Sequence, residues 1–137
     1  MAIYHKEKNK MDNITLYHYS NLNFKGYIKP DFFGLNFYSG YSKKLSGIKR
    51  SYFYLNKYNQ EYYFNGAKYC YIAGINRKKL YNLIDDKKNI VKNLKSGQDI
   101  YKEVKKIGYS GLIGSNGLSC IVLFYPVKIK ERNTLTK

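Results

Sequence analysis

The stretch that decides the fold covers residues 107–130 and reads IGYSGLIGSNGLSCIVLFYPVKIK. Its apolar and β-branched residues gather in two short runs, which predict strands over Tyr109–Gly114 and Ser119–Tyr125. The residues Ser115-Asn116-Gly117 between them are typical of a tight turn, so the two strands are expected to lie side by side. Pro126 ends the second strand because proline has no backbone N–H to donate to a ladder.

Immediately upstream, the segment Asp99–Ile107 is the best predicted helix of the chain. Ile100, Val104 and Ile107 recur at helical spacing and would lie on one face. Gly108 follows as a typical residue for the left-handed position that ends a helix. The sequence therefore predicts a helix that leads directly into the two closing strands.

Three further strands are predicted from runs of β-branched and aromatic residues: Ile14–Tyr19, Ser51–Asn56 and Lys68–Ile75. Leu80–Ile84 is a short apolar segment that suits one helical turn, and Asp86–Leu94 has apolar residues at helical spacing. Five or six short strands with two or three helices indicate the α+β class.

The remaining segments are expected to be irregular. Residues 20–48 are rich in glycine and aromatic residues, which predicts a long ordered loop. Residues 1–12 are polar and rich in lysine and are interpreted as a flexible basic arm. The predicted domain then spans residues 13–131, and residues 132–137 form a tail.

The composition excludes several classes of protein. The 137 residues are 44% hydrophobic and 18% aromatic, which is too apolar for a disordered chain. No apolar run approaches the roughly 20 residues of a membrane span, and no secretory signal is visible, so a cytoplasmic protein without membrane contact is expected. Cys70 and Cys120 are isolated, which argues against a zinc site or a disulfide framework. A monomer is the default expectation.

The charge is strongly positive. Lysine and arginine number 25 against 9 acidic residues, a formal net charge of +16, which favours an anionic partner. Only Arg50, Arg77 and Arg132 are arginines, and lysine acts as a point charge rather than a planar fork. AT-rich codon usage is an equally good explanation of the lysine excess.

The order of several motifs resembles a known family. Tyr17-His18-Tyr19-Ser20 begins the series, Ile107–Ile113 (IGYSGLI) comes late, and Ile121–Lys130 (IVLFYPVKIK) closes it. This order is similar to that of the ADP-ribosyltransferase-like domains of phage and mobile-element proteins of the polyvalent type. The resemblance covers roughly residues 14–131.

The resemblance implies a split, two-sheet ADP-ribosyltransferase-like fold that binds NAD in a cleft. His18 would hold a ribose of NAD, with Tyr17 and Ser20 beside it, and the loop from residue 26 to 47 would cover the cofactor. Tyr52 or Tyr54 would stack on the nicotinamide, because a cationic ring favours an aromatic face. From spacing alone, His18 is more simply a half-buried strand histidine that hydrogen-bonds a neighbour.

The chain departs from the family at the position of the catalytic glutamate, which falls on Ser119 or Cys120. Ser110 also stands where the family has an aspartate. Glu61 is the candidate replacement for the missing acid, because apolar residues follow it.

Three functions follow. The first is an NAD-dependent ADP-ribosyltransferase that modifies a host protein or nucleic acid. The second is a catalytically degenerate form of the same fold that acts as a basic binding or inhibitor protein, of the anti-CRISPR kind, on a protein or nucleic acid. The third is a plain single-strand binder whose tyrosines stack on bases while its lysines contact phosphates.

Overall fold

The computed structural model describes six segments of the chain: residues 12–30, 32–35, 45–55, 67–95, 98–114 and 120–135. Within these segments lie ten strands, one 3-10 turn and one α-helix. In chain order they are β1 (Asn13–Ser20), β2 (Tyr27–Ile28), β3 (Phe32–Leu35), β4 (Leu45–Tyr54), β5 (Tyr69–Asn76), η1 (Arg77–Lys79), β6 (Leu80–Asn82), α3 (Ile100–Lys106), β7 (Gly111–Ile113), β8 (Cys120–Leu123), β9 (Val127–Lys128) and β10 (Glu131–Thr134). The α+β class is confirmed.

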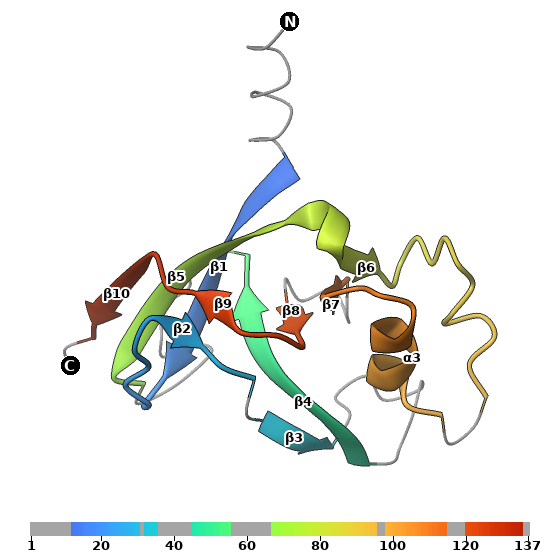
Figure 1. The fold of residues 1–137 in the computed structure, drawn as a ribbon, viewed down its shortest axis with the longest axis horizontal. Coiled ribbons are helices and arrows are strands. Elements are labelled where there is room, and N and C mark those ends of the chain that lie inside the picture. The colour runs from blue at the N-terminus through green and yellow to red at the C-terminus, as the bar shows by residue number, and fades with distance from the viewer. Residues whose placement is uncertain are drawn as a thin grey trace, which may run out of the picture.

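The strands form two sheets of unequal size. The larger sheet has eight strands in the order β10-β5-β1-β4-β8-β7-β6, and β3 pairs with β4 beside this path. All of its pairs are antiparallel except β6 with β7. The smaller sheet is the two-stranded ribbon β2–β9, which lies in front of β1 and β5 in Figure 1.

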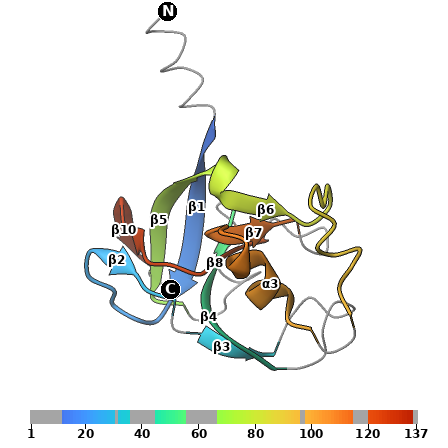
Figure 2. The same cartoon turned by 45° about the vertical axis from the view of Figure 1, so that its right-hand side comes forward.

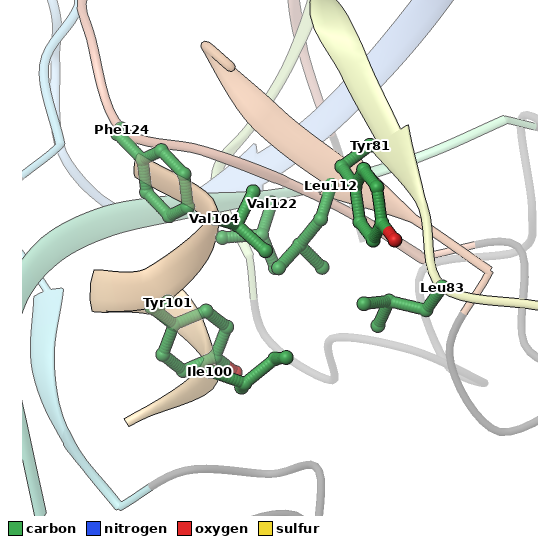
Figure 3. Close-up of a cluster of buried hydrophobic side chains, with 8 residues drawn as sticks. All are labelled: Tyr81, Leu83, Ile100, Tyr101, Val104, Leu112, Val122 and Phe124. Carbon is green, nitrogen blue, oxygen red and sulfur yellow. The ribbon is translucent and has the colours of Figure 1, made fainter. Parts of the chain in front are cut away.

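Each face of the large sheet has its own core, because successive side chains of a strand point to opposite sides. One face, called here the ribbon face, is covered by the β2–β9 ribbon. Its buried side chains are Leu16, Ile28, Phe53, Tyr71, Leu80, Ile121 and Leu123. The other, the helix face, packs against α3 and the segment that precedes it (Figures 2 and 3). Its buried side chains are Tyr81, Leu83, Ile100, Tyr101, Val104, Leu112, Val122 and Phe124.

The predicted helix is confirmed, and its ends have the expected chemistry. The Asp99 side chain accepts a hydrogen bond from the Tyr101 N–H at 3.0 Å, which caps the first turn. Gly108 has a φ of +100°, the left-handed conformation that ends a helix. Ile100 and Val104 are buried, but Ile107 is 44% exposed, so the predicted apolar face ends one turn earlier.

The predicted strands exist with shifted bounds. β1, β5, β7 and β8 fall within one or two residues of the predicted runs, or lie inside them. β7 and β8 pair as expected, with Leu112 opposite Val122. β4 ends at Tyr54, inside the predicted segment Ser51–Asn56. It begins earlier, at Leu45, because its first half pairs with β3.

Several predictions of irregular or helical structure were wrong. The expected loop over residues 20–48 contains β2, β3 and the first half of β4. Leu80–Ile84 supplies strand β6 rather than a helical turn, since β7 lies alongside it in parallel. Residues 132–134 of the expected tail belong to β10, which pairs with β5 along the edge of the sheet. Residues 1–11 of the expected arm lie outside the described residues.

The segment Asp86–Leu94 forms turns instead of the predicted helix, so the described residues contain one α-helix rather than two or three. Asp86 and Asn89 have φ values of 45° and 56°, which interrupt any right-handed helix. The Asp86 carboxylate accepts hydrogen bonds from the Tyr81 hydroxyl, the Val91 N–H at 3.1 Å and the Lys92 N–H at 2.9 Å. This side chain thus satisfies backbone donors that a helix would otherwise use.

Asp86→Asn is expected to lower the free energy of unfolding by about 1 kcal/mol near neutral pH. Burial alone would raise the pKa of Asp86, but the hydrogen bonds from Tyr81, Lys92 and Val91 outweigh it and hold the pKa below its ordinary value. A lowered folded pKa gives stability that is present above the unfolded pKa and lost as the pH falls through the folded pKa. Asparagine tolerates the positive φ, so backbone strain is unchanged.

Urea unfolding of both proteins from neutral pH downward measures this effect. The difference between them should be constant down to about pH 4 and then shrink. A difference that stays constant to the most acidic folded condition would show that the Asp86 charge has no role in holding this segment.

Candidate functional site

His18, the centre of the predicted NAD site, is half-buried on the ribbon face of β1. Its Nδ1 atom lies 2.6 Å from the carbonyl oxygen of Tyr52 on β4. Because a carbonyl oxygen only accepts, this hydrogen bond assigns the proton to Nδ1. The ring therefore joins β1 to β4 through the backbone of the neighbouring strand.

Aromatic rings surround His18. The ring centroids of Phe53, Phe24 and Tyr71 lie 5.0, 5.9 and 6.3 Å from that of His18. The buried Tyr71 hydroxyl donates to the Leu22 carbonyl at 2.6 Å and accepts from the Phe24 N–H at 2.8 Å. This geometry matches a strand histidine that hydrogen-bonds a neighbour, the simpler of the two interpretations.

The other residues predicted for the NAD site do not all share this face. The Ser20 hydroxyl accepts a hydrogen bond from the Leu22 N–H at 3.0 Å, on the same side as His18. Tyr17 and Tyr54 pack on the opposite side, against the buried cluster of Tyr19, Ala67 and Cys70.

Tyr52 also points away from His18, into the helix-face core. Its hydroxyl accepts from Arg50 Nε at 2.7 Å and lies 3.4 Å from the Tyr101 hydroxyl. The sheet therefore divides the predicted set into His18 and Ser20 on one face and the three tyrosines on the other, and the five side chains do not converge on one cleft.

The structure describes little of the predicted acid or of the positions where the family has its glutamate. Glu61 and Ser119 are outside the described residues, and of Cys120 only the backbone is described, paired with Tyr54. Of the described acids, Asp12 lies 3.2 Å from Lys78 Nζ, and Glu103 accepts a hydrogen bond from Gln98. These contacts are structural.

A different feature has the form of a binding site. A cleft of about 470 Å³ opens between the ends of β1 and β5, the turn η1, the start of β7 and the strand β9. Its lining residues are Asn13, Gly74, Ile75, Asn76, Lys79, Ser110, Leu123, Tyr125, Pro126, Val127, Lys128 and Lys130. Three are lysines, and the lining includes no acidic residue among those described. The volume is typical of a small-molecule or nucleotide site.

Backbone contacts position the three cleft lysines. The Lys79 carbonyl accepts the Ser110 N–H at 2.8 Å, which joins η1 to the start of β7. Lys128 lies in β9 and pairs with Tyr27, and the Lys130 N–H donates to the Ile72 carbonyl at 2.8 Å.

Gly74 of β5 makes room for the Lys130 side chain. A Cβ atom on Gly74 would lie 2.6 Å from the Lys130 ammonium nitrogen. The absence of a side chain at Gly74 thus lets Lys130 lie across the strand beside the cleft.

The cleft is separate from the surroundings of His18. Asn13 lines the cleft at the start of β1, five residues before His18, which is roughly 17 Å along a strand. None of the five predicted NAD-site residues that the structure describes lines it. Sequence reasoning missed the cleft because its lysines come from two segments, Lys79 in η1 and Lys128 with Lys130 about fifty residues later. The alternating Lys128 and Lys130 were the only local signal.

Comparisons with known proteins give no further assignment: no family model matches the chain, and no curated protein or solved structure is detectably similar. In the described segments, no helix is long and apolar enough to cross a bilayer. The same segments hold no group of three His, Cys, Asp or Glu side chains that would bind a metal ion.

Proposed function

We propose that this chain is a basic nucleic-acid-binding protein, built on an ADP-ribosyltransferase-like fold that carries out no transfer reaction. The phosphates of the nucleic acid would occupy the cleft lined by Lys79, Lys128 and Lys130. The observation that carries the proposal is the composition of that cleft, with three lysines and no acid among its described lining residues.

Electrostatics favours a polyanion in this cleft. Three lysines that line one cleft carry like charges, and a bound phosphate would offset the repulsion between them. The net charge of +16 attracts an anion over a longer range and raises the rate of encounter. Lysine binds phosphate as a point charge, so contacts of this kind carry little base specificity.

The competing proposal is NAD binding by an active transferase with His18 at the ribose. Two observations favour the nucleic acid. The side chains predicted to hold NAD are divided between two faces of the sheet, and His18 Nδ1 is engaged by the Tyr52 carbonyl. NAD also carries two phosphates, so the test must compare both ligands on the same variants.

Replacing all three cleft lysines, as Lys79→Gln/Lys128→Gln/Lys130→Gln, is expected to weaken oligonucleotide binding about a hundredfold at about 0.1 M salt. Each lost phosphate contact lowers the slope of log affinity against log salt by about 0.7 on a single strand, so the slope should fall by about 2. Fluorescence anisotropy with a labelled oligothymidine of about 12 nucleotides, at several salt concentrations, measures both quantities.

The matched control is Lys92→Gln/Lys102→Gln/Lys106→Gln, which removes the same charge from exposed lysines outside the cleft. An equal loss of affinity in both triple variants would contradict a defined site. If the wild-type chain bound no oligonucleotide, the nucleic-acid proposal would be wrong, and the anionic partner would be an acidic protein surface. NAD binding that survives the cleft variant but is lost in His18→Ala would support the transferase instead.

A further inference from the structure

Two exposed tyrosines lie in or beside the lysine cleft, one among its lining residues and one paired with a lining lysine. Tyr125 is 47% exposed and lines the cleft, and Tyr27 is 50% exposed on β2. Each aromatic ring therefore presents a large apolar surface to solvent beside a cluster of positive charge. Neither ring belongs to a core cluster, so packing of the fold does not account for them.

The geometry of the β2–β9 ribbon points Tyr27 outward. Its partner pairs are Tyr27 with Lys128 and Ile28 with Val127. Ile28 is completely buried in the ribbon-face core, and Val127 packs against the same core. By alternation, Tyr27 and Lys128 share the outer face, with Cβ atoms about 5 Å apart. A potential stacking ring thus lies next to one of the three cleft lysines.

Tyr125 lines the same cleft as Lys128. It precedes Pro126, whose ring restricts the backbone between β8 and β9. The ammonium of Lys105 on α3 lies 5.2 Å from the centroid of the Tyr125 ring, which brings a further positive charge to the rim.

Backbone hydrogen bonds fix Tyr27 against the strand that carries Lys128. The Ile129 N–H donates to the Gly26 carbonyl at 2.9 Å, so the start of β2 is tied to the end of β9. β2 and β9 pair and lie side by side in Figure 1. The rings and the lysines therefore belong to one continuous surface, made of the cleft and the outer face of the ribbon.

Resting on the function proposed above, we infer that the ligand is a single strand, whose unpaired bases stack on Tyr27 and Tyr125 while its phosphates contact the cleft lysines. Aromatic side chains stack on the faces of bases, and in a duplex those faces are covered by neighbouring base pairs. A duplex can use the lysines alone. The tyrosines should therefore set a preference for single strands without a preference for base sequence.

The test compares a single strand of about 12 nucleotides with the duplex of the same sequence. Tyr27→Ala/Tyr125→Ala is expected to weaken single-strand binding about a hundredfold, roughly tenfold for each stacked base, and to leave duplex binding within about twofold. Tyr27→Phe/Tyr125→Phe retains both aromatic faces and should bind the single strand within about threefold of the wild-type chain.

The tyrosine inference and the lysine proposal fail in different ways. If the double alanine variant binds single strand and duplex as the wild type does, or loses both equally, the stacking role is wrong. The lysine proposal still stands in that case, provided that the cleft triple variant loses both ligands. Because both tyrosines are about half exposed, thermal unfolding of the double alanine variant should match that of the double phenylalanine variant within a few degrees.

Discussion

Replacing Gly111 by alanine is expected to lower the free energy of unfolding by at least about 3 kcal/mol. A Cβ atom at this position would lie 1.9 Å from the Val122 carbonyl oxygen and 2.9 Å from Cδ2 of Leu123. The first of these atoms belongs to the backbone of β8, so no side-chain rotation relieves the clash. The strand β7 would have to move away from β8, where the Phe124 N–H donates to the Ser110 carbonyl at 2.9 Å.

Gly108→Ala is the matched control for this prediction. Gly108 has a φ of +100°, but a Cβ atom there would meet nothing within 4 Å, so only backbone strain of about 1 to 2 kcal/mol is expected. Thermal unfolding separates the two, since Gly111→Ala should lower the melting temperature by roughly 10 °C or more. An equal effect of both substitutions would contradict the close approach of β7 and β8.

The parts of the fold that could be predicted are those with a strong local pattern. Asp99 and Gly108 mark the two ends of α3, and the apolar positions between them have helical spacing. β1, β5 and the β7–β8 pair are runs of β-branched and aromatic residues, and each of them lies in the interior of the large sheet. There the local preference and the buried environment agree.

The parts that could not be predicted depend on partners far away in the sequence. β2 is two residues long and exists because Ile28 pairs with Val127, about a hundred positions later. β6 pairs with β7 in parallel, and parallel strands are not joined by a tight turn. The sequence therefore contains no hairpin motif that would predict β6. In Asp86–Leu94 the helical spacing was misleading, because the Asp86 side chain accepts the backbone N–H groups of Val91 and Lys92.

The candidate site was predicted less well than the fold, for a geometric reason. The family resemblance assigns neighbouring residues, such as Tyr17 and His18, to one site. In a strand, however, successive side chains point to opposite faces of the sheet. The cleft lysines show the converse. Lys79 and Lys130 are distant in sequence and line one cleft only because the fold brings η1 and the residues after β9 to the same opening.

Arg50 is the buried cation that joins β4 to α3. Its side chain is completely buried, and the guanidinium carbon lies 4.3 Å from the centroid of the Tyr101 ring. Arg50 Nε donates to the Tyr52 hydroxyl at 2.7 Å, and Nη1 donates to the Ile48 carbonyl at 3.0 Å. A hydrogen bond to a charged group contributes about 1.5 to 3 kcal/mol, and a desolvated cation–π contact about 2 kcal/mol.

Arg50→Ala is expected to lower the free energy of unfolding by about 4 kcal/mol, because these contacts are lost and a cavity is left in the helix-face core. The hydrogen-bond and cation–π contributions are partly offset, because the arginine side chain is better hydrated in the unfolded chain. Arg50→Lys should recover less than half of the loss, because an ammonium has no planar group to stack on Tyr101 and cannot donate in the same fork. Urea unfolding followed by circular dichroism measures all of these variants.

Arg77→Ala, at an exposed position in η1, is the comparison and should change stability by no more than about 0.5 kcal/mol. If Arg50→Ala fell within about 1 kcal/mol of Arg77→Ala, the guanidinium would not support the packing of α3 on β4. Full rescue by Arg50→Lys would show that charge alone matters at this position. A large loss with little rescue would instead assign the stability to the planar guanidinium held against Tyr101, which is the result that the geometry leads us to expect.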